Sequence, residues 1–334
     1  MFHRIAGIGV LSLGLAGASV MSTPAAADSV KDFFAGKQTL ILLAGTRPGG
    51  SYGVYGKILG PYMSKHIPGN PKIVMNFMPG AGGGKAANYI YNVAPKDGSW
   101  MLPSHAIPLL EMLRDKGIRF KTAKMQWLGS FSQITQLMTV WHKAPATTLA
   151  DMKKTSNIIG AFSKSHATFQ WPALLNNLVG TKFKMIVGYR GGATNNLAME
   201  RGETHGWAAS WGNLNGTRPD WLRDKKVKIV AQFGLEAVPE LGNVPMLVDL
   251  VPPGDRDIVE FMTSSTPVSR GVVMAPEVPK DRVAALRKAF ADTMKDPEFI
   301  AEIKKRNLTL RPRTGEEVLA LVKKITGASP ELVA

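Results

Sequence analysis

The chain has 334 residues, a formal net charge of +16 at pH 7 and no cysteine. A chain of this length buries enough apolar surface to fold without disulfides, so the lack of cysteine indicates a large core and does not exclude export. It does exclude a lipid anchor attached to an N-terminal cysteine, and the positive charge favours anionic partners.

Nucleic acid is the first anionic partner to consider, because a basic balance is typical of proteins that bind it. The basic clusters are separated along the chain and carry no interleaved aromatic residues: Lys153-Lys154, Arg223–Lys228 and Lys304–Arg306. A solvated exterior explains these clusters better than a nucleic-acid surface. Small carboxylates and phosphates remain as candidate partners.

The first 27 residues have the pattern of a cleavable secretory signal. Arg4 precedes an apolar run over Ile5–Val20, and small residues end the segment at Ala25-Ala26-Ala27. The apolar run is shorter than the roughly 20 residues that span a bilayer, and no later stretch reaches that length. We therefore predict export with cleavage after Ala27.

The N-terminal third then repeats a strand, a glycine-rich turn and a helix. Strands are predicted at Leu40–Ala44 and Ile73–Phe77, with helices over Gly53–His66 and from Lys85. Glycines let several N–H groups converge, and the start of a helix adds positive potential. The two turns, side by side, would form a cradle for an anion: they are Gly45–Ser51 and Pro79–Gly84.

The middle of the chain begins with an extended segment and then repeats the pattern of strand, turn and helix. The run Trp127–Trp141 suits an extended segment that leaves the first domain. A second α/β unit follows, with strands at Asn157–Phe162 and Lys184–Val187 and helices at Phe169–Leu178 and Asn195–Arg201. Alternation of strands and helices favours mostly parallel sheets, whose ligands lie beyond the carboxyl ends of the strands.

The last third is predicted to return to the first domain. The strand Lys226–Phe233 is expected to lead back, and Gly234–Pro245 is a connector. The expected organisation is residues 1–27 as signal, 28–130 plus 240–334 as lobe 1, and 131–239 as lobe 2. The later elements are helices and short strands at Gly254–Ser264, Arg270–Ala275, Asp281–Lys295, Pro297–Arg306, Leu308–Arg311 and Gly315–Thr326.

Two familiar motifs are incomplete at the glycine turns, and a third is complete but lies in the wrong context. Pro79 and Ala86 occupy positions that a Walker loop needs for glycine and for Ser or Thr, and Lys85 replaces a glycine of the dinucleotide fingerprint. Gly49–Gly53 matches G-x-S-x-G around Ser51, but Thr46-Arg47-Pro48 separate it from the preceding strand. An exported serine hydrolase that uses Ser51 remains the alternative from a different functional class.

The histidines and the aromatic residues of the second unit are further candidates for contact with a ligand. No pair of histidines has the spacing of a metal site, so we predict no metal, whereas His105 and His166 lie in turns after strands and could donate to a ligand. The aromatic residues of the second unit could line an apolar pocket or pack in the core. They are Phe169, Trp171, Trp207, Trp211 and Trp221.

Several segments together resemble one family. They are Pro48-Gly49-Gly50, Pro79–Gly83, Ala94–Gly98, Tyr189–Ala193, Met199–Glu203 and Pro239–Pro245. With these residues the predicted mature chain resembles, nearly from end to end, the periplasmic substrate-binding receptors of tripartite tricarboxylate transporters, the Bug family. The segment Pro239–Pro245 looks like the family's proline-bracketed loop on the hinge side.

The resemblance implies an α/β protein with the type II periplasmic-binding-protein fold, in which two α/β lobes are joined by two crossing segments around a ligand cleft. It implies a periplasmic receptor that is not an enzyme, needs no cofactor and delivers a carboxylate to integral-membrane permease subunits. The ligand-binding residues carried over are Arg47, Gly49, Gly50, Ser51, Tyr52, Gly80, Ala81, Gly82, Gly83, Ser104, His105, Ser163, Ser165, His166, Thr168, Arg190, Gly191 and Gly192.

The chain departs from the family pattern at Gly53, where members commonly carry an Asp suited to an ammonium group. Its loss argues against an amino-acid ligand, and Ser51 and Arg190 add donors that suit a carboxylate. Dicarboxylates, tricarboxylates and aromatic carboxylates all stay open as ligands. The loaded receptor could also signal to a membrane sensor, instead of or besides serving a permease.

Overall fold

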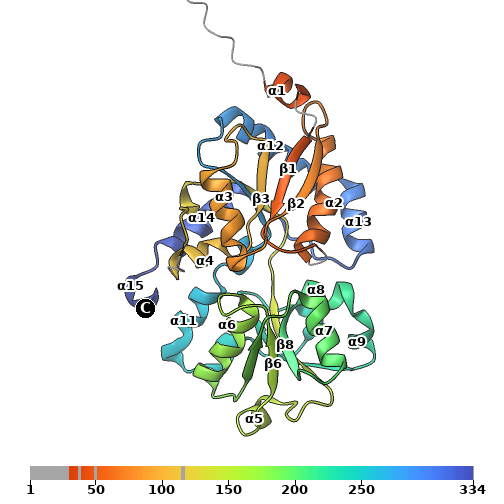
Figure 1. Cartoon of the computed structure of the whole chain (residues 1–334), viewed down its shortest axis with the longest axis vertical. Coiled ribbons are helices and arrows are strands. Elements are labelled where there is room, and N and C mark those ends of the chain that lie inside the picture. Colours follow the sequence, from red (N-terminus) through yellow and green to blue (C-terminus); the bar gives the residue numbers. More distant parts are fainter. Residues whose placement is uncertain (1–29, 37–38, 49–50, 114–116, 334) are drawn as a thin grey trace, which may run out of the picture.

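The structure is a computed structural model that describes residues 30–36, 39–48, 51–113 and 117–333. Within these ranges the chain forms two α/β lobes, each built on its own sheet and set one above the other in Figure 1. This confirms the predicted fold class. The predicted signal, Met1–Ala27, lies outside the described residues.

Lobe 1 holds a six-stranded sheet. In spatial order its strands are β11 (Arg313–Thr314), β4 (Gln126–Ser130), β10 (Gly271–Met274), β3 (Trp100–Pro103), β1 (Thr39–Ala44) and β2 (Lys72–Phe77). β1 runs parallel to β2 and β3, whereas β10 runs antiparallel to β3 and β4. The almost unbroken apolar run of β1 suits a parallel strand that is covered on both faces.

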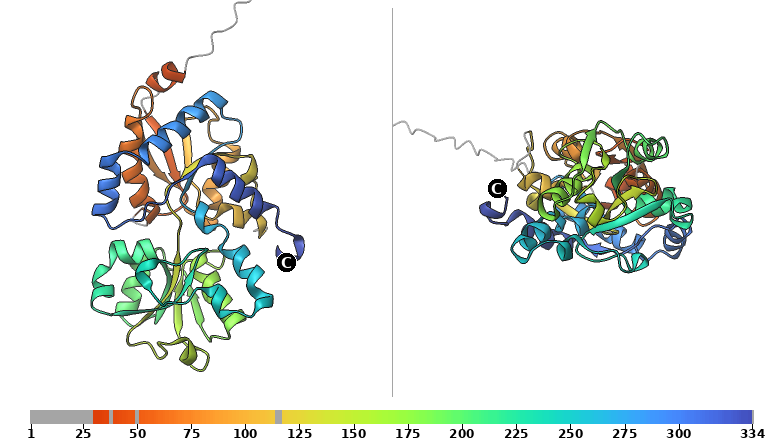
Figure 2. Two further views of the ribbon diagram at one scale, coloured as in Figure 1. Left: turned by 180° about the vertical axis from the view of Figure 1, so that it is seen from behind. Right: turned by 90° about the horizontal axis from the view of Figure 1, so that it is seen from below.

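Helices cover both faces of this sheet, and the C-terminal helices stand in front of it when the molecule is seen from behind (Figure 2). α14 starts with a capping box in which Thr314 and Glu317 bond reciprocally, and it spans the predicted residues. The helices of lobe 1 are α1 (Val30–Gly36), α2 (Ser51–Lys65), α3 (Gly84–Asn92), α4 (Ile107–Met112), α12 (Lys280–Thr293), α13 (Pro297–Lys305), α14 (Gly315–Thr326) and α15 (Pro330–Val333).

Lobe 2 holds a five-stranded sheet. In spatial order its strands are β7 (Lys184–Val187), β6 (Ile158–Ala161), β8 (Gly206–Ser210), β5 (Gln136–Trp141) and β9 (Val227–Phe233). β6 is parallel to β7 and β8, whereas β5 is antiparallel to β8 and β9. The helices are α5 (Leu149–Met152), α6 (Ala167–Leu174), which continues as a π-helical turn over Leu175–Val179, α7 (Gly192–Glu200), α8 (Trp211–Thr217) and α9 (Pro219–Arg223).

Two segments cross between the sheets. Residues 131–135 lead from β4 to β5, and the chain returns between β9 and β10 through α10 (Leu247–Leu250) and α11 (Arg256–Thr263). The buried side chain of Gln232 secures the return segment: its Nε2 donates to the Val244 carbonyl at 2.8 Å, and its Oε1 accepts from the Val238 N–H at 2.8 Å. The proline-bracketed loop is therefore tied to the last strand of lobe 2.

Three predictions about elements need correction. Lys226–Phe233 was expected to lead into lobe 1, but β9 pairs with β5 in lobe 2, and the return begins only after it. The predicted strand at Leu308–Arg311 is irregular chain, and the short strand lies at Arg313–Thr314 instead. β8 was not predicted, because its run Gly206–Ser210 is short and rich in small residues with weak strand propensity.

The extended run Trp127–Trp141 forms two strands with the first crossing between them, as predicted for a segment that leaves the first lobe. None of the helices in the described part of the chain combines the length and apolar character needed to cross a bilayer.

Candidate functional site

The two glycine turns lie in direct contact. The first follows β1 at Ala44, and a Cβ added to its Gly45 would lie only 2.6 Å from the Cα of Gly83 in the second. Only glycine permits such a close approach of two backbones. The predicted side-by-side arrangement is confirmed, whereas binding of an anion there stays a prediction. Gly49, Gly50 and the side chain of Ser51 lie outside the described residues.

The second turn has an unusual backbone. Four successive residues have positive φ: 142° at Gly80, 46° at Ala81, 58° at Gly82 and 100° at Gly83. A left-handed conformation is strained for alanine and free for glycine, so the glycines here are required by the turn itself. Strain of this kind gathers at binding and catalytic sites.

The bonds that close this turn also show which of its amides are already used within the fold. Gly83 N–H and Lys85 N–H both bond to the Gly80 carbonyl, and Gly84 N–H bonds to the Ala81 carbonyl. Among the bonds of the described residues, this leaves the N–H groups of Gly80, Ala81 and Gly82 without a partner, as candidate donors for a solute. Of the four amides of Gly80–Gly83, only that of Gly83 is used inside the turn.

His105 joins the cradle directly after β3. Its φ is 49°, and its ring stacks on Tyr52 with centroids 3.6 Å apart and lies against Gly83. The side chain is buried, and its Nε2 has no hydrogen-bond partner among the described residues. Burial lowers the pKa of His105 to about 3, and the charges of His166 and Arg270 act in the same direction. A neutral imidazole with an unpaired nitrogen is available here to a bound solute.

Tyr52 and Ser104 are tied to the segment that leads into β10. The Tyr52 hydroxyl donates to the Ser269 carbonyl at 2.8 Å, and the Ser104 hydroxyl donates to the Val268 carbonyl at 2.5 Å. Burial raises the pKa of Tyr52 above its ordinary value, and the charge of Arg270 partly opposes this rise. These bonds place both side chains beside the cradle and use their protons within the fold.

The turn between β6 and α6 faces the cradle from lobe 2. A Cβ at Gly82 would lie 3.6 Å from the Ser165 carbonyl, so the two lobes approach each other here. His166 caps α6, with its Nδ1 accepting from the Thr168 N–H at 3.1 Å, and burial lowers its pKa to about 4. The Thr168 hydroxyl accepts from Phe162 N–H, and the Ser163 and Ser165 hydroxyls are 3.5 Å apart.

The remaining predicted residues lie differently. Arg47 and Arg190 are both exposed, so neither adds buried positive charge to this region. Gly191 has φ 151° and precedes α7. A Cβ at Gly192 would press on Asn213 and on the Trp207 ring, at 2.9 and 3.1 Å, so this glycine serves packing inside lobe 2.

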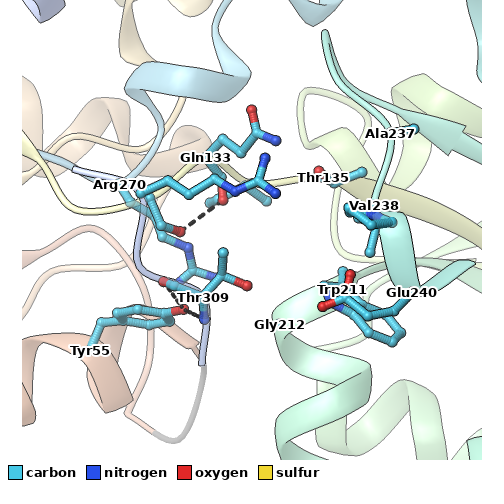
Figure 3. A pocket seen from close by; sticks show the side chains of 14 residues that line it. Tyr55, Gln133, Thr135, Trp211, Gly212, Ala237, Val238, Glu240, Arg270 and Thr309 are labelled. Carbon is cyan, nitrogen blue, oxygen red and sulfur yellow. Dashed lines mark hydrogen bonds between the residues drawn. The ribbon is translucent and has the colours of Figure 1, made fainter. Parts of the chain in front are cut away.

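A second part of the cleft, near the crossing segments, was not predicted. Both lobes and both crossings line a pocket of about 450 Å³, counted to its open mouth. In Figure 3, Tyr55 and Thr309 lie on the lobe 1 side, and Trp211 and Glu240 face them from the other side. The charged residue that is buried at this pocket is Arg270, which immediately precedes β10. A charged residue at the head of the apolar run Arg270–Ala275 was the signal for it.

The tryptophans divide between the two uses left open by the sequence. Trp171 is buried and stacks on Phe233 with centroids 5.0 Å apart. Trp207 is buried and donates to Asn196, and Trp221 is buried beneath the Arg218 guanidinium. These three pack within the fold, whereas the half-buried Trp211 lines the pocket near the crossings.

Solved structures of the same architecture are numerous. The TctC solute-binding protein from Polaromonas is 18% identical over 86% of this chain and 95% of its own, with a TM-score of 0.61. MatC from Rhodopseudomonas palustris, solved with malate, is 18% identical over 89% and 99%, with a TM-score of 0.70. Rpa4515 from R. palustris, solved with adipate, is 14% identical over 88% and 95%, with a TM-score of 0.68.

The fold is that of the TctC and Bug solute-binding proteins. No protein-family model matches the sequence, and a search of curated protein sequences finds no match. The predicted resemblance is thus confirmed at the level of the fold.

Proposed function

We propose that this protein is an exported solute-binding receptor that captures a small organic carboxylate between its lobes. In this proposal the receptor delivers the carboxylate to the permease subunits of a tripartite tricarboxylate-type transporter and acts in the periplasm after removal of residues 1–27. Residues 28–130 and 240–334 form lobe 1, and 131–239 form lobe 2. Neighbours of the same fold bind malate and adipate.

The observation that carries the proposal is the meeting of the two glycine turns with His105 and with the His166 turn of the other lobe. The unbonded amides of Gly80, Ala81 and Gly82 supply donors that cost no side-chain entropy, and hydrogen bonds to a charged group are stronger than neutral ones. A solute that touches both lobes stabilises the closed arrangement over an open one.

The contacts of the histidines bear on the hydrolase alternative. A Ser-His-Asp arrangement needs an acid that orients the histidine. Within the described ranges neither His105 nor His166 forms an ion pair with a carboxylate, whereas His66 pairs with Asp296 at 3.2 Å. These contacts favour a binding site over a catalytic triad.

The test uses Gly82→Pro, because proline holds φ near −65° and cannot adopt the 58° found at Gly82. A thermal-shift screen of organic acids on the wild type identifies a carboxylate, since a ligand of the folded state raises the melting temperature. Calorimetry with that acid should show a loss of about 100-fold or more in the variant, as expected when two bonds to a charged group are lost.

The matched control is Gly180→Pro, which imposes the same conflict at a φ of 81°, beyond the end of the π-helical turn that continues α6. This variant should lose stability yet keep its affinity for the acid. Equal affinity in wild type and folded Gly82→Pro would contradict the proposed site.

A further inference from the structure

Arg270 is a buried charge in an unusual setting. Its side chain is only 2% exposed, although it lines the pocket that both lobes share near the crossing segments. Removing a guanidinium from water costs several kcal/mol, as an order of magnitude, unless partners replace the lost hydration. The contacts of Arg270 therefore decide what this residue is for.

Those contacts are incomplete. The guanidinium lies 3.8 Å from the centroid of the Tyr55 ring, which offers a cation–π interaction. Its Nε and Nη1 are buried and have no hydrogen-bond partner among the described residues, and no carboxylate of those residues forms an ion pair with it. The charge is thus held in place by an aromatic face, with two N–H donor groups unused.

The other arginine that lines the pocket is exposed to solvent and paired with a carboxylate. Arg311 is exposed and pairs with Glu236 at 3.0 Å. One pocket therefore contains a solvated, paired arginine and a buried one whose donors are unpaired. Only the second is arranged to receive a charge from outside the chain.

Arg270 also contacts the opposite lobe. A Cβ at Gly212, the second residue of α8, would lie 3.1 Å from its Nη2, so glycine makes room for the guanidinium. A group bound to Arg270 would lie where lobe 1 meets lobe 2. Binding at this point would therefore favour closure of the lobes.

The glycine cradle and Arg270 are linked through two rings. Gly83 lies against His105, His105 stacks on Tyr52, and the Tyr52 hydroxyl donates to the carbonyl of Ser269, the neighbour of Arg270. A solute that contacts both ends of this path must extend beyond a single carboxylate. The two ends suit two negative groups.

We propose that Arg270 forms a second anion-binding subsite, which holds a second carboxylate of the solute while the first lies on the glycine turns. This inference rests on the proposed function and adds a residue that selects for dianions. A planar guanidinium matches a carboxylate with parallel N–H donors, which an amide cannot do with equal strength. A solute with a neutral far end would leave the buried charge uncompensated.

The experiment compares succinate, glutarate and adipate with their respective monoamides on the wild-type protein. These pairs keep the length and remove one charge, and calorimetry measures each affinity. For the diacid that fits, we expect binding about 10- to 100-fold tighter than that of its monoamide, the range of a hydrogen bond between charged groups. This comparison needs no variant, so it stands even if a substitution at Arg270 impairs folding.

Two variants then assign the preference. Arg270→Gln should bring the diacid close to the affinity of the monoamide and change monoamide binding by less than about threefold. Arg311→Gln, in the same pocket, should keep the wild-type preference. Circular dichroism and thermal unfolding establish that each variant is folded.

The outcomes separate the two proposals. Binding of diacid and monoamide with equal affinity by the wild type, or an unchanged preference in folded Arg270→Gln, would overturn the Arg270 subsite while leaving a carboxylate receptor. A wild-type protein that binds none of the organic acids in the thermal-shift screen would overturn the proposed function and this inference together. Loss of preference in Arg270→Gln with its retention in Arg311→Gln supports the subsite.

Discussion

The two ends of the cleft offer positive potential by different means. At the glycine turns the donors are backbone amides, held by four successive residues with positive φ and by two turns in contact. Near the crossing segments the donor is one buried guanidinium on an aromatic face. The first end depends on local backbone geometry, whereas the second depends on segments that meet only in the folded chain. Substitutions should therefore affect the two ends separately.

Of the changes that compare the two ends, Gly45→Ala is expected to have the largest effect on stability and affinity. It disrupts the contact between the two glycine turns, where the donors are backbone amides. The added Cβ would meet the Gly83 Cα at 2.6 Å, and backbone cannot yield as a side chain does. We expect a loss of about 2 kcal/mol in the free energy of unfolding and at least about tenfold in carboxylate affinity. Denaturant unfolding and calorimetry measure both. Gly254→Ala is the control, because nothing lies within 4 Å of its added Cβ, and equal results for the two would refute the predicted contact.

The second-largest effect should come from low pH, which destabilises the protein through the histidines at the glycine-turn end of the cleft. The pKa of His105 is lowered to about 3 and that of His166 to about 4, so between pH 6.5 and these values the unfolded chain binds more protons than the native one. The free energy of unfolding therefore falls as the pH falls through this window, by about 2 kcal/mol at pH 5 for His105 alone. Denaturant unfolding at a series of pH values measures the slope.

The control for this pH dependence is a matched pair of variants. His105→Asn should make the slope shallower and leave the contribution of His166, since asparagine tolerates the left-handed backbone and does not titrate. His142→Gln replaces an exposed histidine and should leave the slope unchanged. A wild-type stability that is flat from pH 6.5 to 5 would contradict the burial of neutral histidines in the cleft.

Substitutions of Tyr55 should have a smaller effect, at the end of the cleft near the crossing segments. Its hydroxyl bonds to both the carbonyl and the N–H of Thr309 at 3.2 Å, while its ring lies under Arg270. Tyr55→Phe should cost about 1 kcal/mol of stability and preserve any diacid preference, because the ring remains. Tyr55→Leu should weaken diacid binding as well. Identical binding by the two variants would show that the ring does not support the guanidinium.

Gly212→Ala should have the smallest effect. The new methyl would press on Arg270 Nη2 at 3.1 Å, but the end of an arginine side chain can shift by a few tenths of an ångström. We expect about threefold weaker diacid binding with little change in stability. Gly216→Ala in the same helix meets only an ordinary contact at 3.7 Å and should bind as the wild type does. Tighter binding in Gly212→Ala would show that the methyl improves the subsite.

Much of the fold followed from local pattern. Apolar runs that end in glycine turns predicted β1, β2 and their helices, and the Thr314-x-x-Glu317 signature begins α14. β8 escaped prediction because Gly206–Ser210 is made of small residues whose strand conformation depends on neighbours in the sheet. β9 was predicted as a strand but was expected to lead back to lobe 1, since its pairing with β5 joins residues far apart in the sequence.

The candidate site likewise contains residues that the sequence could indicate and contacts that it could not. Residues within a few positions of a strand end, such as Gly82, His105 and His166, could be predicted because turn chemistry is local. Their contacts with one another could not, and neither could the loss of Gly83 and Lys85 amides to bonds inside the turn. The tryptophans looked equivalent in sequence, and only packing separated Trp211 from the rest.

The sequence by itself determined the strand-turn-helix units and the glycines of the cradle, because backbone torsion and apolar periodicity are properties of neighbouring residues. Tertiary structure alone decided that Gly45 touches Gly83, that the turn of Ser165 and His166 approaches Gly82, and that Arg270 is buried without a hydrogen-bond partner for its Nε and Nη1 among the described residues. Burial and pairing of a charge depend on what distant segments bring to it. The residue we propose to select the solute thus became visible only in the folded molecule.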